Sequence, residues 1–401
     1  MNNNLIILGN GFDLHNKLNS GFWDFFDARE NELKNTTDFT KLFDEDSMLE
    51  IQKDKKTREN IRGLIIKRVK PNLLKYSLRM HERYKRFNNI SVKKISFWDF
   101  YFQIRKLKDP DWFYVENQIQ GFFEEKKSYA EKTRFELVLE YLDALLDVGS
   151  GNAEESKVDN YTLLSEHLNR YDFETEALVF IIVNVFKYDF QKQHLADFLL
   201  SQLVKFEKRL QNYLVEKVSS TPEYHDNVTR CIDELSGGIP YNILNFNYTD
   251  IPMSKNGIEQ NVHGSLADHP ILGIDAMNVP LGVPYYSFTK TFRIMKLANE
   301  AAKKVLPKRP EKVIFYGHSL SEADYSYFQS IFDYYSIYDS EVKLVFYYST
   351  YPKHDETMVS VEQYARVVKL LAAYGKTIPN HGNNLLHKLM LERRISFKLL
   401  E

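Results

Sequence analysis

The chain has 401 residues, of which 43% are hydrophobic and 27% charged, a balance that excludes disorder as its main state. Its 53 basic and 55 acidic residues leave a net charge of −2, and its single cysteine, Cys231, excludes an intramolecular disulfide and a cysteine-built zinc site. The first residues lack a signal-peptide pattern, and the most apolar run, 177–186, is about half the length that crosses a bilayer. We therefore expect a soluble, cytoplasmic protein of one large or two modest domains, without a membrane segment.

In the first part of the chain, one strand pattern is followed by helical patterns. Leu5–Leu8 is a short apolar run that ends at Gly9, which predicts a buried parallel strand. Hydrophobic periodicity predicts helices over 60–86, with a kink at Pro71, over 135–146, and over 175–218, with a break near Asp189. Glycine, serine and asparagine predict a loop over 147–160.

From Gly238 onward, short apolar runs alternate with helical patterns. We expect strands at 241–246, 312–316, 342–348 and 395–399, and helices at 323–335, 358–374 and 385–393. This alternation is typical of a parallel sheet that is covered on both faces. The sequence therefore predicts an α/β fold, with a Rossmann-like parallel sheet formed by residues 1–28 and 237–401. Residues 29–236 would form a large α-helical insertion or cap.

One segment departs from the neutral average charge. Residues 61–110 contain 14 Lys and Arg against 3 acidic residues. Such a block is typical of a surface that binds nucleic acid or an acidic partner. A solvated helix face explains the same charges, so both interpretations stay open.

A glycine turn, Gly9-Asn10-Gly11-Phe12-Asp13, directly follows the first predicted strand. Paired glycines let a backbone approach a pyrophosphate closely, and a helix that begins there attracts anions. The third glycine of the dinucleotide fingerprint is absent, since Leu14 follows the turn. A tight strand–helix turn without a ligand explains the two glycines equally well.

A second turn, Gly317-His318-Ser319-Leu320-Ser321-Glu322-Ala323-Asp324, also joins a predicted strand to a helix. Its hydroxyl, imidazole and carboxylate groups could hold a ribose or a phosphate. We expect Ser321 to cap the helix, and Ser319 to be the better ligand candidate.

A third polar cluster, Asn245-Phe246-Asn247-Tyr248-Thr249-Asp250, follows the predicted strand at 241–246, and His263 lies shortly after it. Asparagine is uncommon in strand interiors, and its amide can hold a water molecule. A neutral histidine accepts a proton near pH 7. We therefore predict Asn247 and His263 as catalytic residues, although a turn asparagine and a hydrogen-bonded, partly buried histidine are the simpler explanations.

Five motifs together resemble the AbiH family of bacterial abortive-infection proteins, which defend against phage. The motifs follow the family's order along the chain, and they are GNGFD (9–13), FNYTD (246–250), NVHGS (261–265), ILGID (271–275) and YGHSLSEAD (316–324). Trp112 and Glu116, in DWFYVE, resemble a W-x-x-x-E element of that family. The resemblance implies a role in anti-phage defence.

AbiH proteins are in turn similar to sirtuin-like effectors that consume NAD. This similarity implies roles for a glycine loop, an asparagine, a histidine and a late turn, which here are Gly9 and Gly11, Asn247, His263, and Gly317, Ser319 and Asp324. The chain departs from the sirtuin pattern where Thr249 separates Tyr248 from Asp250 and where Asn10 replaces an alanine. The four-cysteine zinc module of the protein deacylases is also missing, which disfavours deacylation.

The first functional hypothesis is an NAD+ glycohydrolase, with NAD as the substrate and no metal ion. Asn247 would orient the water or the ribose, and His263 would accept a proton. The turn from Gly9 to Asp13 would hold the pyrophosphate, and the adenosine half would contact the late turn, chiefly through Ser319 and Asp324, with Gly317 and His318.

A second hypothesis is a nucleotide-binding sensor or scaffold without turnover. It would contact nucleic acid, a phage protein or another partner through the basic helical insertion, and in either case we expect a homo-oligomer. A nuclease has the least support, because no D-x-D or H-x-x-x-H spacing follows a strand.

Overall fold

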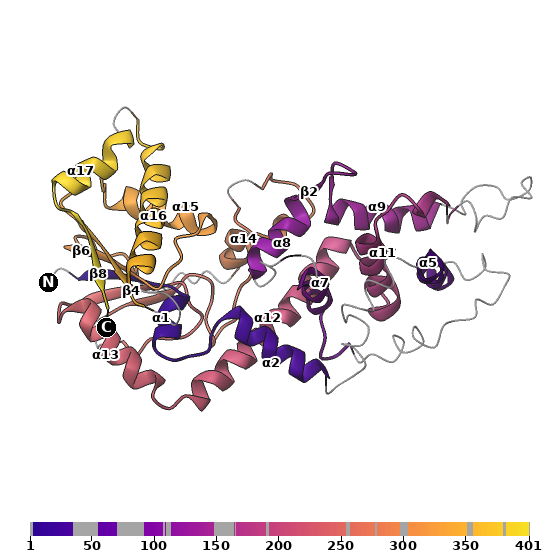
Figure 1. The fold of residues 1–401 in the computed structure, drawn as a ribbon, viewed down its shortest axis with the longest axis horizontal. Helices are drawn as coiled ribbons and strands as arrows, with labels where there is room; N and C mark the ends of the chain where they lie inside the picture. The colour runs from indigo at the N-terminus through magenta and orange to yellow at the C-terminus, as the bar shows by residue number, and fades with distance from the viewer. Residues whose placement is uncertain are drawn as a thin grey trace, which may run out of the picture.

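The structure is a computed structural model, and it describes most of the 401 residues. The described residues are 3–34, 55–69, 92–106, 109, 114–147, 164, 166–189, 192–253, 257–276, 279–296, 304–350, 356–379 and 382–400. Figure 1 shows an elongated molecule with a sheet and its helices at one end and a helical region at the other.

Six parallel strands form one sheet in the order β5-β4-β1-β6-β7-β8. The strands are β1 (Asn4–Leu8), β4 (Tyr241–Asn245), β5 (Glu259–Asn261), β6 (Lys312–Tyr316), β7 (Lys343–Tyr348) and β8 (Ile395–Leu399). Numbered by their appearance in the chain, the strands follow the order 3-2-1-4-5-6 of the Rossmann fold. The predicted Rossmann-like parallel sheet is therefore confirmed.

The strand β1 lies at the centre of this sheet, between β4 and β6. Its residues Leu5–Leu8 are fully buried, as their unbroken apolar run predicts. The strand β5 was not predicted, because it is short and its three residues, Glu259-Gln260-Asn261, are polar. It lies at the sheet edge, where polar side chains can reach water.

Helices cover both faces of the sheet, as predicted. One face packs against α15 (Tyr325–Tyr334), α16 (Glu356–Gly375) and α17 (Leu385–Leu391). The other face packs against α1 (Asn10–His15) and α13 (Tyr224–Ser236). Successive residues of a strand point to opposite faces. In β6, for example, Phe315 and Ile314 do so, and this strand therefore contributes to both layers.

The helical region has its own aromatic-rich core. Its helices are α2 (Phe22–Lys34), α5 (Lys55–Val69), α7 (Phe97–Lys106), α8 (Val115–Glu124), α9 (Arg134–Asp147), α11 (Phe173–Phe180) and α12 (Leu195–Ser220), with the hairpin β2 (Lys126–Lys127) and β3 (Lys132–Thr133). The predicted break near Asp189 is confirmed, because a π-helical turn, η3 (Ile181–Val185), ends before α12 begins. The predicted kink at Pro71, the rest of that helix and nearly all of the loop at 147–160 lie outside the described residues.

The hydrophobic clusters cross the predicted domain boundaries. The helix α13 lies within the segment predicted as insertion, yet Val228, Ile232 and Leu235 pack on the sheet. Conversely, Leu272 and Phe288 follow β5, the third strand of the sheet along the chain, but pack into the helical core. The sheet region and the helical region therefore each contain residues from a segment that the sequence had assigned to the other region.

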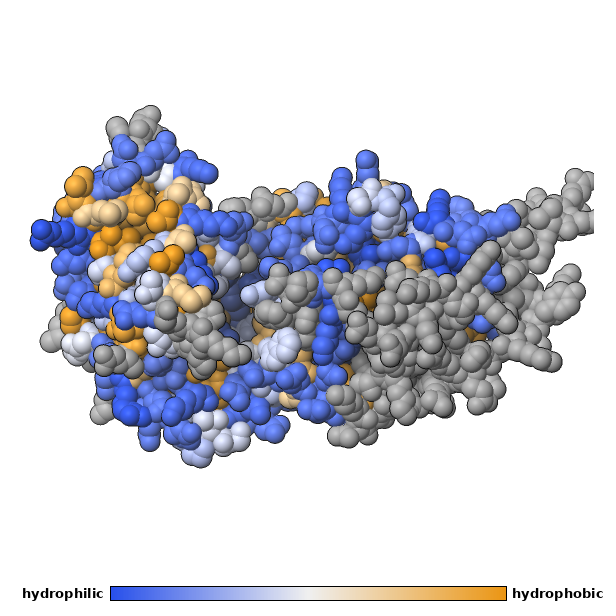
Figure 2. Space-filling view, viewed as in Figure 1, coloured by the Kyte–Doolittle hydropathy of each residue, from blue (hydrophilic) through white to orange (hydrophobic). Residues whose placement is uncertain are grey.

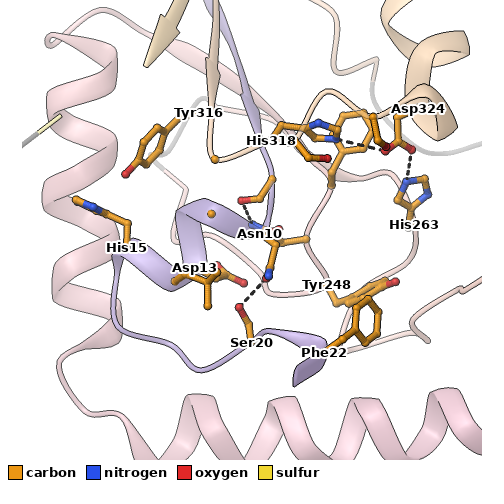
Figure 3. A pocket seen from close by; sticks show the side chains of 18 of the residues that line it. Asn10, Asp13, His15, Ser20, Phe22, Tyr248, His263, Tyr316, His318 and Asp324 are labelled. Carbon is orange, nitrogen blue, oxygen red and sulfur yellow. Dashed lines mark hydrogen bonds and ion pairs between the residues drawn. The ribbon is translucent and has the colours of Figure 1, made fainter. Parts of the chain in front are cut away.

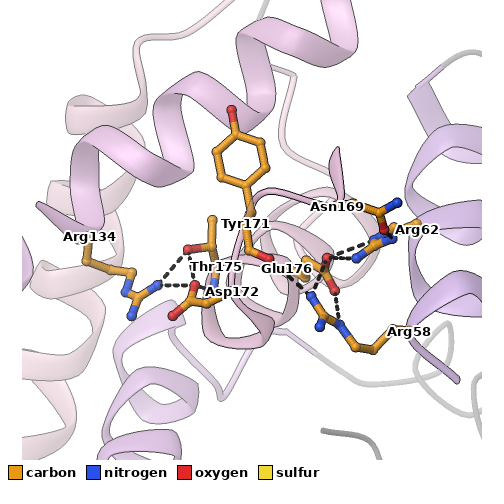
Figure 4. Close-up of polar contacts among 8 residues, drawn as sticks. All are labelled: Arg58, Arg62, Arg134, Asn169, Tyr171, Asp172, Thr175 and Glu176. Atoms are coloured by element: carbon orange, nitrogen blue, oxygen red, sulfur yellow. Dashed lines mark hydrogen bonds and ion pairs between the residues drawn. The ribbon is translucent and has the colours of Figure 1, made fainter. Parts of the chain in front are cut away.

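A buried ion-pair cluster joins α5 to α11 within the helical region (Figure 4). Glu176 is fully buried, and it accepts hydrogen bonds from Arg58 at 2.9 Å and from Arg62 at 2.7 Å. Nearby, Arg134 pairs with Asp172 at 2.6 Å. Arg62 belongs to the basic segment 61–110, so at least this charge is neutralised inside the protein.

No helix among the described residues is long and apolar enough to cross a membrane.

Candidate functional site

A pocket of about 990 Å³ lies at the carboxyl ends of β1, β4, β6 and β7 (Figure 3). The strand order reverses between β1 and β6, and this switch point is where parallel sheets of this kind bind their ligands. Side chains of the helical region, including Phe22, Glu116 and Leu214, line the pocket as well. The pocket is therefore built by both regions of the molecule.

The pocket brings together side chains that are far apart in the sequence. The residues predicted for the site that line it are Gly9, Asn10, Gly11, Asp13, Asn247, His263, Gly317, His318, Ser319 and Asp324. Phe12 is the exception, because its ring is fully buried in the core and contacts Tyr316 edge-on at 6.2 Å. The roles of these residues stay predictions.

The two glycine turns pack backbone against backbone. The amide of Gly11 donates to the carbonyl of Gly317 at 2.8 Å, and the amide of Gly9 donates to the carbonyl of Tyr316 at 3.1 Å. A Cβ at Gly317, which has a φ of +70°, would lie 2.2 Å from the amide nitrogen of Phe12. Close packing of the turns thus explains the glycines, and the amides of Gly9 and Gly11 are already used within the protein.

Asparagine side chains hold the turn after β4 in place. Asn247 donates through Nδ2 to the carbonyl of Gly9 at 3.1 Å, and Asn245 accepts from the amide of Asn247 at 3.0 Å. Asn261 donates to the carbonyl of Asn247 at 3.1 Å. Because one end of its amide holds the Gly9 turn, Asn247 positions the backbone of the pocket.

Asp324 is the centre of a buried charge cluster on the pocket wall (Figure 3). Its carboxylate lies 3.1 Å from His263 Nε2, 3.5 Å from His318 Nε2 and 3.6 Å from Lys290 Nζ. Burial alone would raise the pKa of Asp324, but the charge of Lys290 and the hydrogen bonds from both histidines hold the pKa well below its usual range. Asp324 is therefore ionised at neutral pH.

Lys290 connects this carboxylate to the helical region. It is buried in α14 (Lys290–Met295), and its Nζ lies 2.7 Å from the carboxylate of Glu116 in α8. Burial opposes its charge, but Glu116 and Asp324 raise the pKa of Lys290 above its ordinary value. Lys290 thus stays charged between two carboxylates, and Glu116 keeps 25% of its side chain exposed.

His263 is a buried histidine of this cluster. Burial and the charge of Lys290 lower its pKa, against the opposing effect of Asp324, so the ring is neutral. Asp324 is closer to Nε2 than Lys290 is, at 3.1 Å against 3.5 Å, which favours the tautomer with the proton on Nε2. The other nitrogen, Nδ1, is buried and has no hydrogen-bond partner among the described residues.

Two further carboxyls have raised pKa values, Asp13 in the pocket lining and Glu259 in β5. Asp13 accepts hydrogen bonds from Tyr224 at 2.7 Å and from Thr249 at 2.9 Å, yet burial raises its pKa to about 6. Burial also raises the pKa of Glu259 to about 7, against hydrogen bonds from Asn245 and from the amide of Ile251. Both groups therefore titrate within the physiological range.

The sequence left parts of this site unassigned. Lys290 carried no signal, since a lone lysine is ordinarily a surface residue. Glu116 belongs to the W-x-x-x-E element but had no assigned role, and Trp112 lies outside the described residues. Ser321 stands at the start of the short turn 322–324, as predicted, but its side chain makes no capping hydrogen bond in the described part of the chain.

Within the described ranges, no three or more His, Cys, Asp or Glu side chains are grouped so as to hold a metal ion.

Fold and site together define a Rossmann-type α/β protein with a pocket at the switch point of its sheet. A comparison with protein families finds that "Bacteriophage abortive infection AbiH" matches residues 5–348, so the chain belongs to the AbiH family. Membership implies a role in abortive infection, the defence of bacteria against phage. Searches of curated proteins and of solved structures found no match. The further likeness to sirtuin-like effectors stays a prediction.

Proposed function

We propose that this AbiH protein binds NAD in the switch-point pocket and hydrolyses its nicotinamide–ribose bond. The observation that supports the proposal most is the His263–Asp324 pair, which leaves a ring nitrogen without a partner among the described residues, beside a nucleotide-sized pocket. The pocket's 990 Å³ lies at the upper end of the range of small-molecule and cofactor sites.

Cleavage of this bond needs little activation of the leaving group. The carbon–nitrogen bond breaks with its electron pair going to the pyridinium nitrogen, and neutral nicotinamide leaves an oxocarbenium-like ribose. Water then bonds to the same ribose carbon and gives up one proton, so NAD+ and water yield nicotinamide, ADP-ribose and a proton. The protein's tasks are to orient the ribose, stabilise positive charge and accept that proton.

In this scheme, His263 Nδ1 accepts the proton of the attacking water. Asp324, hydrogen-bonded to Nε2 at 3.1 Å, orients the ring and stabilises the imidazolium that forms. Lys290 disfavours protonation of His263 before the reaction, because its charge lowers the histidine pKa. The carboxylate of Glu116 is partly exposed to the pocket and would accept a hydrogen bond from a ribose hydroxyl.

The geometry changes two of the roles assigned from the sequence. Asp324 contacts three side chains that are or can become cationic, so we assign it to the reacting end of the pocket instead of the adenosine half. Phosphate contacts would come from side chains such as Ser319, because the amides of Gly9 and Gly11 and both ring nitrogens of His318 are already bonded within the protein. Asn247 would position the Gly9 turn.

One observation favours a second candidate, a nucleotide sensor without turnover. The Nδ1 of His263 is buried, and the ring packs edge-on against Phe246 and Tyr327, with ring centroids 5.5 Å and 5.6 Å apart. A water molecule reaches this nitrogen only if the wall around it opens. Without that movement, the pocket would bind a nucleotide and leave it intact.

The test combines turnover with binding. We expect purified protein to convert NAD to nicotinamide and ADP-ribose, separated by chromatography, and His263→Ala to lower the rate about 10²- to 10⁴-fold. His387→Ala, which changes an exposed histidine of α17, is the matched control and should keep full activity. NAD binding by calorimetry without products would support the sensor instead. Wild-type protein that neither binds nor consumes NAD would contradict both candidates.

A further inference from the structure

The helix α16 has an apolar face that no part of its own sheet covers. Its inner face packs on the sheet through residues such as Val367 and Leu371. On the outer face, Met358, Val361 and Val368 are 50%, 59% and 45% exposed. Apolar surface gathers over α16 and α17 at this end of the molecule (Figure 2). Such a concentration of apolar side chains on a soluble protein commonly marks an interaction site.

The exposed residues follow the spacing of a coiled-coil seam. Positions 358, 361, 365, 368 and 372 alternate steps of three and four, and they hold Met, Val, Ala, Val and Ala. Ala365 and Ala372 are exposed as well. The seam therefore runs for two heptads along one side of the helix. Its small alanine side chains permit close approach of a second helix.

Charges beside the seam are complementary to those of a second, reversed copy. Glu362 and Lys369 occupy equivalent heptad positions, one in each half of the seam, and both side chains are exposed. A parallel pair of helices would place like charges together, whereas an antiparallel pair places Glu362 of each copy near Lys369 of the other. Their present partners are Arg366 at 3.3 Å and Glu322 at 2.7 Å, and surface pairs of this kind exchange at little cost.

The sheet edge next to α16 is formed by β8. The strand β8 is the last strand of the sheet, and Phe397 within it contacts the Tyr364 ring of α16 at 4.4 Å. Exposed sheet edges are generally shielded by another element or another chain. A second copy seated on α16 would lie next to this edge.

We propose that α16 forms the interface of a two-fold symmetric dimer of this chain. The seam of one copy packs antiparallel on the seam of the other, with the symmetry axis near Ala365. An interface of this kind is self-complementary, as the charge pattern requires. The inference is independent of the chemistry proposed for the pocket.

The first test is the mass of the protein in solution, by light scattering or sedimentation. Wild type should be a dimer, and Val361→Glu should raise the dimer dissociation constant by roughly a hundredfold, since each dimer gains two charges in an apolar contact. Leu281→Glu is the matched control, because Leu281 is 82% exposed but lies outside α16. Glu362→Lys should weaken the dimer, and Glu362→Lys with Lys369→Glu should restore it.

Cysteine cross-linking tests the orientation. The one native cysteine, Cys231, is buried, so an added cysteine on α16 is the reactive thiol. Ala365→Cys should form a disulfide between copies under mild oxidation, because the two positions meet near the axis. Ala372→Cys should not, since antiparallel helices separate these positions by about 21 Å. Cross-linking of both variants would overturn the antiparallel arrangement, and a monomeric wild type or a dimer unaffected by Val361→Glu would overturn the interface.

Discussion

Two of the buried charge clusters of this protein are built from different residue types. In the helical region, Glu176 has guanidinium groups on both carboxylate oxygens, from Arg58 and Arg62 (Figure 4). At the pocket, Asp324 contacts two histidines and a lysine, and one histidine nitrogen has no partner in the described part of the chain (Figure 3). Arginine keeps its proton at any physiological pH, whereas histidine exchanges it. The first cluster therefore has a structural role, linking α5 to α11. The second has the composition of a reactive site.

The largest effect on stability should come from disrupting the ion-pair cluster around Glu176. Glu176→Gln removes the charge that neutralises Arg62, a buried residue, so we expect a loss of about 3–5 kcal/mol in the free energy of unfolding. Chemical denaturation measures it. Glu140→Gln, which breaks the partly exposed pair with Lys132, is the control and should cost about 0–1 kcal/mol. Similar losses for both variants would contradict the structural role of Glu176.

The corresponding change at the pocket should act mainly on function. Asp324→Asn removes the charge that orients and stabilises His263, so NAD turnover should fall about a hundredfold. The loss of stability should be smaller than for Glu176→Gln, because Lys290 keeps Glu116 at 2.7 Å. Turnover and denaturation, measured side by side, check both expectations. Full activity of Asp324→Asn would show that this carboxylate takes no part in the proposed reaction.

Glu259 represents a third kind of carboxyl, partly buried, whose hydrogen bonds come from an amide side chain and the backbone. Its pKa in the folded protein is raised to about 7, so folding disfavours the ionised form. Stability contributed by the protonated group is present at low pH and is lost as pH rises from about 4.5 to about 7. Relative to Glu259→Gln, wild type should lose on the order of 2 kcal/mol over that range, and a difference that stays constant with pH would contradict the raised pKa.

The smallest effect is expected at Ser321. Its side chain makes no capping hydrogen bond within the described residues, so Ser321→Ala should change the free energy of unfolding by less than about 0.5 kcal/mol. Thermal denaturation checks this value. A loss near 1 kcal/mol would show that the hydroxyl caps the turn in solution after all.

The sequence predicted the parallel sheet well because five of its strands contain apolar runs. It missed β5, whose three polar residues resemble a loop. It also placed α13 with the insertion, although this helix packs on the sheet. An amphipathic pattern identifies a helix and its buried face, but not the surface on which that face packs.

For the site, position after a strand was the informative signal. Turns after β1, β4 and β6 had to meet at the carboxyl ends of the parallel strands, and they do line one pocket. The hydrogen bonds of Gly9 and Gly11 depend on how the two turns pack against each other, which no local pattern encodes. Lys290 could not be predicted from the sequence for the same reason, because its burial depends on Glu116 and Asp324 from distant segments.

The position of β1 at the centre of the sheet sets the order of events during synthesis. This strand begins at Asn4, but its neighbours β4 and β6 begin at Tyr241 and Lys312. At usual translation rates, about 15–60 s separate the emergence of β1 from that of β6. A ribosome-bound chain that ends before β6 lacks Gly317, His318 and Asp324, and with them one wall of the pocket. For a protein of abortive infection, this topology delays any activity of the pocket until most of the polypeptide has been made.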